Sequence, residues 1–243
     1  MSRMPSGKTL AVVAVLLAGA LAFGVPEFLA DRADRSGALC LGPGQEGTIC
    51  RFVGGPIEMG GTPVFVAKFK HAFLPTTRKI DFIDGFGQTW TAPPKTLTDG
   101  ASIPILFEPL MGDRQSREYL EAAALHDAYC GVGNETLETY QTKRWEEVHR
   151  MFYEALLVAG TPPIRAKMMF AAVYLGGPRW DDPERSLDDV DPEAMKREAK
   201  WCFKWIEDTD PTAEEIIAWM TRREAALKAG ENTKPVYSVP EGL

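Results

Sequence analysis

The chain has few of the residues that build common metal and cofactor sites. Its 243 residues include four cysteines and three histidines. No C-x-x-C pair is present, which excludes a zinc ribbon and a thioredoxin-type motif. The sequence also has no P-loop and no G-x-S-x-G nucleophile elbow. Any active site must therefore be found from scattered polar residues and not from one of these motifs.

Basic residues are outnumbered by acidic residues. The chain has 27 Lys and Arg against 34 Asp and Glu, a formal net charge of -7. This balance argues against a large nucleic-acid interface, because such interfaces neutralise phosphates with Lys and Arg. An acidic segment at residues 181–193 lacks the ligand spacing of an EF-hand, so we interpret it as a solvated loop. We expect no nucleic-acid partner.

The sequence has one long hydrophobic run, at its start. Residues 10–23 are apolar and uncharged, and they follow Arg3 and Lys8. A basic start before such a run is typical of a secretory signal. Extended to residue 30 the segment is long enough to span a bilayer, although Pro26 and Glu27 interrupt it. We expect residues 1–30 to be a signal peptide or a single membrane anchor, with the body exported, periplasmic or membrane-anchored outside the cytoplasm.

A location outside the cytoplasm would allow the cysteines to form disulfides. Cys40 and Cys50 flank a short Gly-rich loop, and an oxidising space allows a disulfide between them. Cys130 and Cys202 are candidates for a second pair. Four cysteines allow three connectivities, and all three remain open at this point.

The first half of the body has the pattern of a small antiparallel sheet. Residues 31–61 are rich in Gly and Pro and favour loops. Residues 64–69 are β-branched and aromatic, which predicts a strand. Residues 79–83 alternate polar and apolar side chains, and a turn at 84–85 leads to a return strand at 88–91.

From residue 116 onward the hydrophobic period becomes helical. The pattern predicts five helices, at residues 116–130, 136–158, 164–175, 194–207 and 212–228, the last capped by Asp210. The expected fold class is α+β: a small antiparallel β-sheet, then a bundle of about five helices, after an N-terminal hydrophobic helix. We place an α+β domain at 31–180, a helical extension at 181–230 and a loose tail at 231–243.

One group of motifs resembles a known family. The chain reads T-D-G-A-S-I-P at 98–104, H-D at 126–127, F-Y-E-A-L at 152–156 and V-Y-L-G at 173–176. In this order and spacing, residues 82–180 resemble the domain of unknown function 1353 family of phages and bacteria. The resemblance implies a small β-region, a turn, an H-D helix and two further helices. It implies no activity, because the family has none established. The family usually has Asp where this chain has His149; either residue binds metals or accepts hydrogen bonds.

Two interpretations of Asp99 remain open. Thr98, Asp99 and Gly100 have the chemistry of a rigid turn, since Asp bonds backbone two residues on and Gly accepts unusual dihedrals. The functional interpretation is that Asp99 points at His126. His71 stands among lysines near a strand end, and we interpret it as a surface residue.

The helical residues suggest a polar cluster. His126 lies on an apolar face with Tyr119, Ala122, Ala123 and Cys130, and His149 approaches the core between Trp145 and Phe152. Adjacent residues on a helix do not face each other, so Asp127 is expected to serve a partner other than His126. The candidate catalytic residues are His126, Asp127, Asp99 and His149. The candidate ligands of a divalent metal are His126, His149 and Asp99.

These residues fit three arrangements: a 2-His-1-carboxylate metal site, a His-Asp acid/base pair, or a buried hydrogen-bond network. Two functions follow. One is an exported hydrolase that acts on cell-envelope material, peptidoglycan or lipid. The other is a non-enzymatic envelope or phage-related binding module in which the cluster is a structural staple. An uncleaved N-terminal segment would add a membrane contact.

Overall fold

The computed structural model describes residues 40, 47, 49–67, 69, 71–100, 104 and 117–235. The expected signal or anchor at 1–30 lies outside these residues, as do residues 101–103 of the seven-residue motif and the last part of the tail. In the part of the chain that is described, no helix has both the length and the apolar character needed to cross a membrane.

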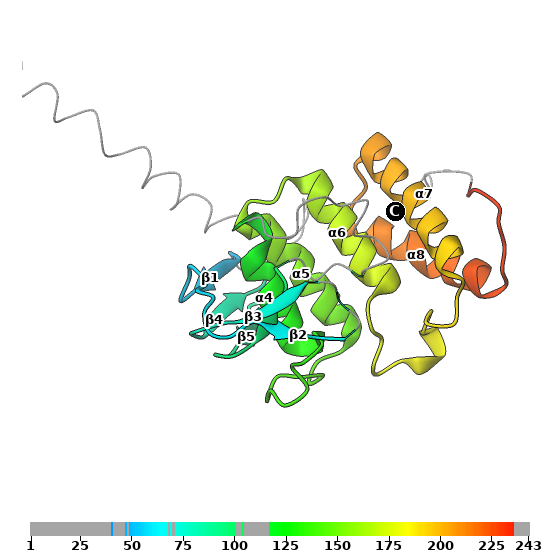
Figure 1. The fold of residues 1–243 in the computed structure, drawn as a ribbon. Helices are drawn as coiled ribbons and strands as arrows, with labels where there is room; N and C mark the ends of the chain where they lie inside the picture. Colours follow the sequence, from blue (N-terminus) through cyan, green and yellow to red (C-terminus); the bar gives the residue numbers. More distant parts are fainter. Residues whose placement is uncertain are drawn as a thin grey trace, which may run out of the picture.

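The strands form two small antiparallel sheets (Figure 1). The first has the order β1-β4-β5, with bounds Arg51–Val53, Ile80–Ile83 and Thr89–Ala92; the second has the order β2-β3-β6, with bounds Val64–Phe65, Ala72–Pro75 and Leu97–Thr98. The predicted strands at 79–83 and 88–91 are confirmed as β4 and β5, whose register pairs Phe82 with Trp90. The strand predicted at 64–69 covers only β2. Strands β1, β3 and β6 were not predicted.

Asp84 sets the turn between β4 and β5. Its Oδ1 accepts hydrogen bonds from the backbone N–H groups of Phe86 and Gln88, each at 2.9 Å. Its Oδ2 accepts the indole N–H of the buried Trp90 at 2.7 Å. This is the turn chemistry expected of Asp followed by Gly, and it fixes the register of the hairpin.

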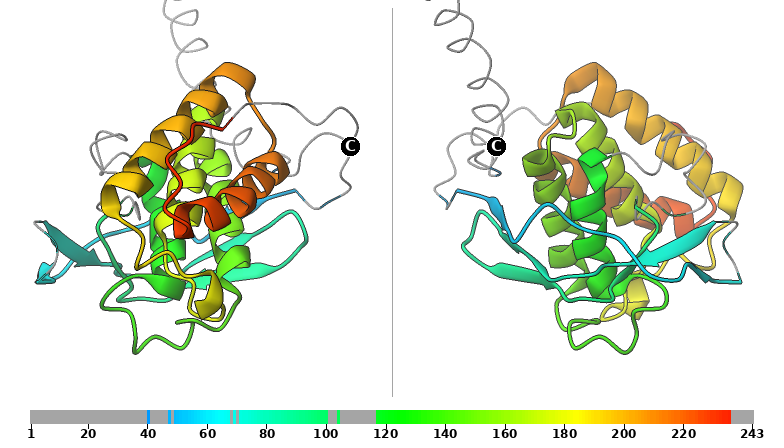
Figure 2. Two further views of the ribbon diagram at one scale, coloured as in Figure 1. Left: turned by 90° about the vertical axis from the view of Figure 1, so that its right-hand side faces the viewer. Right: turned by 60° about the vertical axis from the view of Figure 1, so that its left-hand side comes forward.

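Five helices and the segments that connect them follow the strands in the described chain. The helices are α4 Arg117–Cys130, α5 Trp145–Ala159, α6 Pro163–Gly176, α7 Pro192–Thr209 and α8 Ala213–Lys228, with a short 3-10 turn η3 Pro183–Arg185. The predicted α+β class is confirmed. Strands of both sheets contact α4, β1 also contacts α5, and α6 lies between α5 and the pair α7 and α8 (Figures 1 and 2). The core side chains of α4 and α5 are therefore enclosed between strands and helices.

The second helix begins later than predicted. Residues 136–144 form turns, and α5 starts at Trp145. The turns satisfy carbonyl groups that the last turn of α4 cannot satisfy itself: the hydroxyl of Thr139 donates to the Ala128 carbonyl and the backbone N–H of Gln141 donates to the Tyr129 carbonyl, both at 2.8 Å. Gln141 has a φ of 54°, which a helix cannot contain.

The start of the last helix also differs from the prediction. Asp210 ends α7 in a left-handed conformation, with a φ of 46°. Thr212 caps α8 instead: its side chain accepts the N–H of Glu215, and the Glu215 carboxylate accepts the N–H of Thr212. The reciprocal pair satisfies two N–H groups at the start of the helix.

The disulfide between Cys40 and Cys50 is present and confirms that expectation. It lies against α5, where Oε2 of the buried Glu154 is 3.3 Å from Sγ of Cys40 and accepts the N–H of Gly85. Burial is the main cause that raises the pKa of Glu154 from 4.5 to about 6, and the Arg150 guanidinium at 3.0 Å opposes the shift. Glu154 thus joins the disulfide segment and the β4–β5 turn to α5.

This carboxyl group makes the stability of the fold depend on pH. Its pKa is raised in the folded state, so its contribution to stability is full below pH 4.5 and falls as the pH rises through 6. Relative to Glu154→Gln, the wild type should lose about 2 kcal/mol of unfolding free energy between pH 4.5 and pH 7. Urea denaturation at both pH values measures this. Glu207→Gln, at an exposed position of α7, is the control. A difference between wild type and Glu154→Gln that does not vary with pH would contradict the assignment.

Candidate functional site

Helix α4 carries His126, Asp127 and Cys130. The residues of its predicted apolar face are buried, but so is every other residue from 122 to 130, so this part of the helix is enclosed on all sides. His126 and Cys130 are one turn apart, and Nε2 of His126 lies 3.4 Å from Sγ of Cys130. The small alanines around them let the next helix approach closely.

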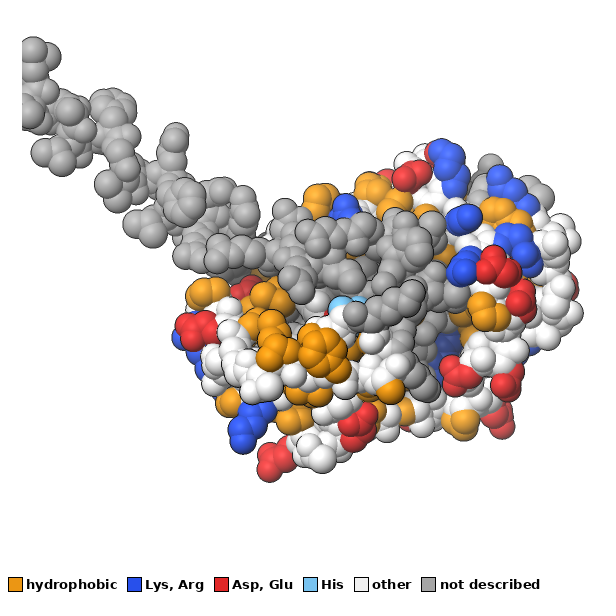
Figure 3. All heavy atoms as spheres, in the orientation of Figure 1, with side chains coloured by type: hydrophobic (Ala, Val, Ile, Leu, Met, Phe, Trp, Pro, Cys, Tyr) orange, Lys and Arg blue, Asp and Glu red, His pale blue; other side chains and the backbone are white. Residues whose placement is uncertain are grey.

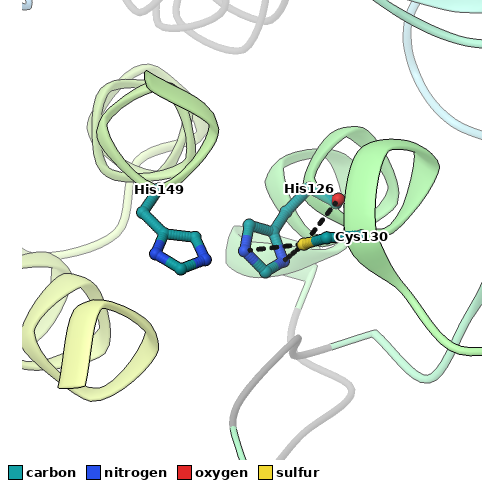
Figure 4. Close-up of side chains that lie close together, drawn as sticks. All are labelled: His126, Cys130 and His149. Carbon is teal, nitrogen blue, oxygen red and sulfur yellow. Dashed lines mark hydrogen bonds between the residues drawn. The ribbon is translucent and has the colours of Figure 1, made fainter. Parts of the chain in front are cut away.

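Helix α5 places His149 against His126. The two ring centroids are 5.2 Å apart with an interplanar angle of 33°, and a ring nitrogen of His149 is directed toward His126 (Figure 4). Trp145 and Phe152 flank the pair, as their helical spacing predicted. The two histidines that the sequence proposed as site residues are therefore brought together by the α4–α5 contact.

His149 is fully buried. Within the described residues neither of its ring nitrogens has a hydrogen-bond partner. Burial lowers the pKa of His149 well below 6.5, and the nearby His126 and Arg179 lower it further. The ring is consequently neutral and keeps a nitrogen lone pair available to a ligand.

The predicted pair of Cys130 and Cys202 is wrong. Both cysteines are buried and free. Cys202 belongs to α7, which packs on α6, whereas Cys130 ends α4 beside His126. Burial raises the pKa of the Cys130 thiol well above 9, and the negative charge of Asp127 raises it further. Cys130 is thus a site residue that the sequence analysis assigned to a disulfide.

Asp127 interacts with His126 after all. Its Oδ1 lies 3.8 Å from Nδ1 of His126, although adjacent helical residues were expected to diverge. The side chains of Asp127 and His126 line the same pocket. Burial is the main cause that raises the pKa of Asp127, and the charge of Asp99 adds to it, while hydrogen bonds with His126 and Thr98 lower it. The sequence analysis expected Asp127 to have a partner other than His126, and Thr98 is such a partner.

Asp99 pairs with His71. Oδ2 of Asp99 is 3.0 Å from Nε2 of His71, whereas His126 was the partner expected from the sequence. His71, which we interpreted as a surface residue, is only partly exposed: its side chain is 27% exposed and its ring packs against Phe69 and Phe73. The antiparallel pairing of β3 with β6 produces this contact, because His71 precedes β3 and Asp99 follows β6. The predicted turn is also present, with the hydroxyl of Thr98 accepting the N–H of Gly100.

These groups meet at a pocket of about 220 Å³. Its polar side chains come from three predicted residues and from the cysteine of α4: Asp99, His126, Asp127 and Cys130. The rest of the lining is apolar or glycine: Phe69, Phe73, Pro104, Gly131, Val132, Gly176, Gly177 and Pro178. A second cavity, of about 230 Å³, shares Pro104, Gly176 and Gly177 with the first. The two hollows therefore adjoin along these residues.

Two chemical uses fit this geometry. Ligand atoms of His126, Cys130 and His149 all lie within 4.8 Å of one another, which is a candidate metal-binding group. Cys130 takes the place that the sequence analysis gave to Asp99. The only signal for it was the four-residue spacing from His126. The pair Asp99 and His71 is separate from that group and provides a carboxylate and an imidazole for proton transfer at the same pocket.

Comparison with known proteins finds a family model that matches part of the chain. Residues 76–173 match DUF1353, a protein of unknown function. The resemblance seen in the sequence is thus confirmed over the DUF1353 segment, which contains Asp99, His126, Asp127, Cys130 and His149 but not His71. DUF1353 assigns no activity to them.

Two curated relatives come from Sinorhizobium fredii (strain NBRC 101917 / NGR234). Uncharacterized protein y4iH is 40% identical over 104 residues, 42% of this chain and 40% of its own. Uncharacterized protein y4jT is 30% identical over 126 residues, 52% of this chain and 35% of its own. The chain therefore spans well under half the length of either relative. No solved structure gives a significant match.

Gly177 provides a test of the packing around His149. A Cβ at Gly177 would lie 2.8 Å from Cε1 and 2.9 Å from Nε2 of His149, and would also meet the Val173 carbonyl. Gly177→Ala should therefore lower the unfolding free energy by about 1–3 kcal/mol. The double variant Gly177→Ala/His149→Ala should lose less than the sum of the single changes, because the ring is no longer in the way. Strictly additive losses in a denaturation cycle would contradict the contact.

Proposed function

We propose that the protein is a hydrolase of cell-envelope material and that the pocket between α4, the end of β6 and residues 176–178 is its active site. The observation that carries the proposal is the lining of this pocket, where two carboxylates, an imidazole and a thiol converge on an otherwise apolar surface. Few convergent polar groups in an apolar hollow are typical of a catalytic site.

The carboxylate of Asp99 is the proposed proton-transfer group. It reaches the pocket and is held from behind by His71 at 3.0 Å. Hydrolysis adds water across a carbonyl–heteroatom bond: the water oxygen bonds to the carbonyl carbon, and the leaving heteroatom takes up the proton that the water gives up. Asp99 is placed to accept and return that proton, with His71 stabilising its charge. His126 and Asp127 form the wall where the attacking water would be bound.

The size of the pocket limits the substrate group that it accepts. A volume of about 220 Å³ is below the range of about 300–1,000 Å³ for sites that hold a drug-sized ligand. It suits one amino-acid side chain or a short acyl group beside the scissile bond, in contact with Phe69, Phe73 and Val132. The adjoining cavity of about 230 Å³ has room for the other side of that bond.

The envelope as the location of the substrate is supported by two features. The N-terminal sequence has the pattern of an export signal or anchor. The disulfide between Cys40 and Cys50 suits an oxidising compartment outside the cytoplasm. A hydrolase there meets peptidoglycan and lipid, and the small apolar pocket favours peptide side chains or acyl groups over sugar rings. Hydrophobic side chains exposed over the strands, among them Phe65, suit contact with such material (Figure 3).

The test is turnover of peptidoglycan fragments, phospholipid vesicles and short-chain nitrophenyl esters, with products identified by mass spectrometry. Asp99→Asn should lower kcat about 10²–10⁴-fold and leave the melting temperature nearly unchanged. His71→Gln should cause a smaller loss. Asp208→Asn, an exposed position of α7, is the control and should retain full activity.

The binding-module alternative makes the opposite prediction. Under it the wild type turns over none of these probes, and Asp99→Asn costs about 1–3 kcal/mol of unfolding free energy because it weakens a buried pair. That combination of results would contradict the hydrolase.

A further inference from the structure

We propose that His126, Cys130 and His149 bind one Zn²⁺ ion, with a fourth coordination position open toward the pocket. The site itself stands on the contacts of these three residues. Its use, to activate the attacking water, rests on the proposed hydrolase function. Neither the family description nor the relatives assign a metal to this segment.

The two ligand atoms of α4 are spaced as in a tetrahedral zinc site. Zinc bonds of about 2.0–2.1 Å to nitrogen and about 2.3 Å to sulfur place neighbouring ligand atoms roughly 3.3–3.6 Å apart. Nε2 of His126 and Sγ of Cys130 are 3.4 Å apart, and the third ligand atom, from His149, lies within 4.8 Å of both. The spacing of four residues on α4 puts the first two on one helical face, and α5 supplies the third (Figure 4).

His149 is the independent observation that points to a ligand. Its side chain is completely buried, and in the described chain neither ring nitrogen has a hydrogen-bond partner. An unpaired buried polar atom costs about 1–3 kcal/mol, so a histidine that only filled space would be a poor choice beside Trp145 and Phe152. The ring nitrogen directed toward His126 gains a bond as soon as an ion binds within reach of it.

The surroundings of His126 orient it as a ligand. Oδ1 of Asp127 lies 3.8 Å from Nδ1 of His126, and Sγ of Cys130 lies closer to Nε2, at 3.4 Å, than to Nδ1, at 3.8 Å. A carboxylate behind a histidine ligand is a common support of zinc sites, because it fixes the ring and strengthens the metal bond. The thiolate of Cys130 and the carboxylate of Asp127 together would also balance the two positive charges of the ion.

The coordination count indicates a catalytic site and not a structural one. Structural zinc sites use four protein ligands, whereas catalytic sites use three and keep one position for water. Among the described residues the group has three candidates, His126, Cys130 and His149. Two of them line the pocket, and Gly177, which lines it too, leaves open the space beside Nε2 of His149 that a Cβ would fill. A water on the fourth position would face the substrate pocket.

The experiment is a Zn²⁺ titration of the full-length chelator-treated protein against a competing indicator, with Co²⁺ absorption as a second measurement. One ion should bind per chain, and Co²⁺ should give a thiolate charge-transfer band. Cys130→Ser and His149→Gln should each weaken binding at least 100-fold, and Asp127→Asn about 10–100-fold. Cys202→Ser and His71→Gln are matched controls, a buried free cysteine and a histidine outside the group, and should bind as the wild type does.

Two results would overturn the zinc site: no stoichiometric binding to the wild type, or binding that Cys130→Ser and His149→Gln leave unchanged. Circular dichroism checks that each variant is folded, and either variant alone is sufficient for the test. Other outcomes would contradict the proposed function without affecting the zinc site, or the reverse. Zinc bound without turnover of any probe contradicts the hydrolase and leaves the site standing. Turnover that persists in the zinc-free protein and is lost in Asp99→Asn contradicts the role of the metal and leaves the hydrolase standing.

Discussion

The contact between α4 and α5 is the interaction on which the rest of the molecule depends. It buries the ring of His126 against that of His149 at 5.2 Å, and strands of both sheets close over α4 from outside. The disulfide segment and the β4–β5 turn are tied to the same α5 helix through Glu154. A site built at this contact is held by the core itself, which gives its side chains the fixed positions that metal binding and catalysis require.

The helical half of the fold could be predicted because each helix has its own signal in sequence. Apolar residues at helical spacing identified α4 to α8, and Trp145 and Phe152, which were predicted to flank His149, are buried. Strands β1 and β6 have three and two residues, too few for a period to show, and β3 is as long as β4 but its sequence Ala-Phe-Leu-Pro does not alternate polar and apolar side chains. Their pairing partners are distant in sequence, so only the folded chain reveals them.

The sequence predicted which residues form the candidate site better than it predicted which of them contact one another. His126, Asp127, His149 and Asp99 do gather near one pocket or its wall. The partners were missed where strand pairing or helix packing decides them: β3 against β6 brings His71 to Asp99, and the separation of α4 from α7 leaves Cys130 free beside His126. Residue type alone could not distinguish a cysteine beside a histidine from a disulfide partner.

The central claim is that His149 is present for chemistry and not for stability. The most direct test is the unfolding free energy of metal-free His149→Leu, which replaces two buried ring nitrogens by an apolar side chain of similar size. The account predicts that this variant is as stable as the metal-free wild type, or more stable by up to about 1–3 kcal/mol, because no hydrogen bond of His149 is lost. A loss of several kcal/mol would contradict it and would make the histidine pair a structural network.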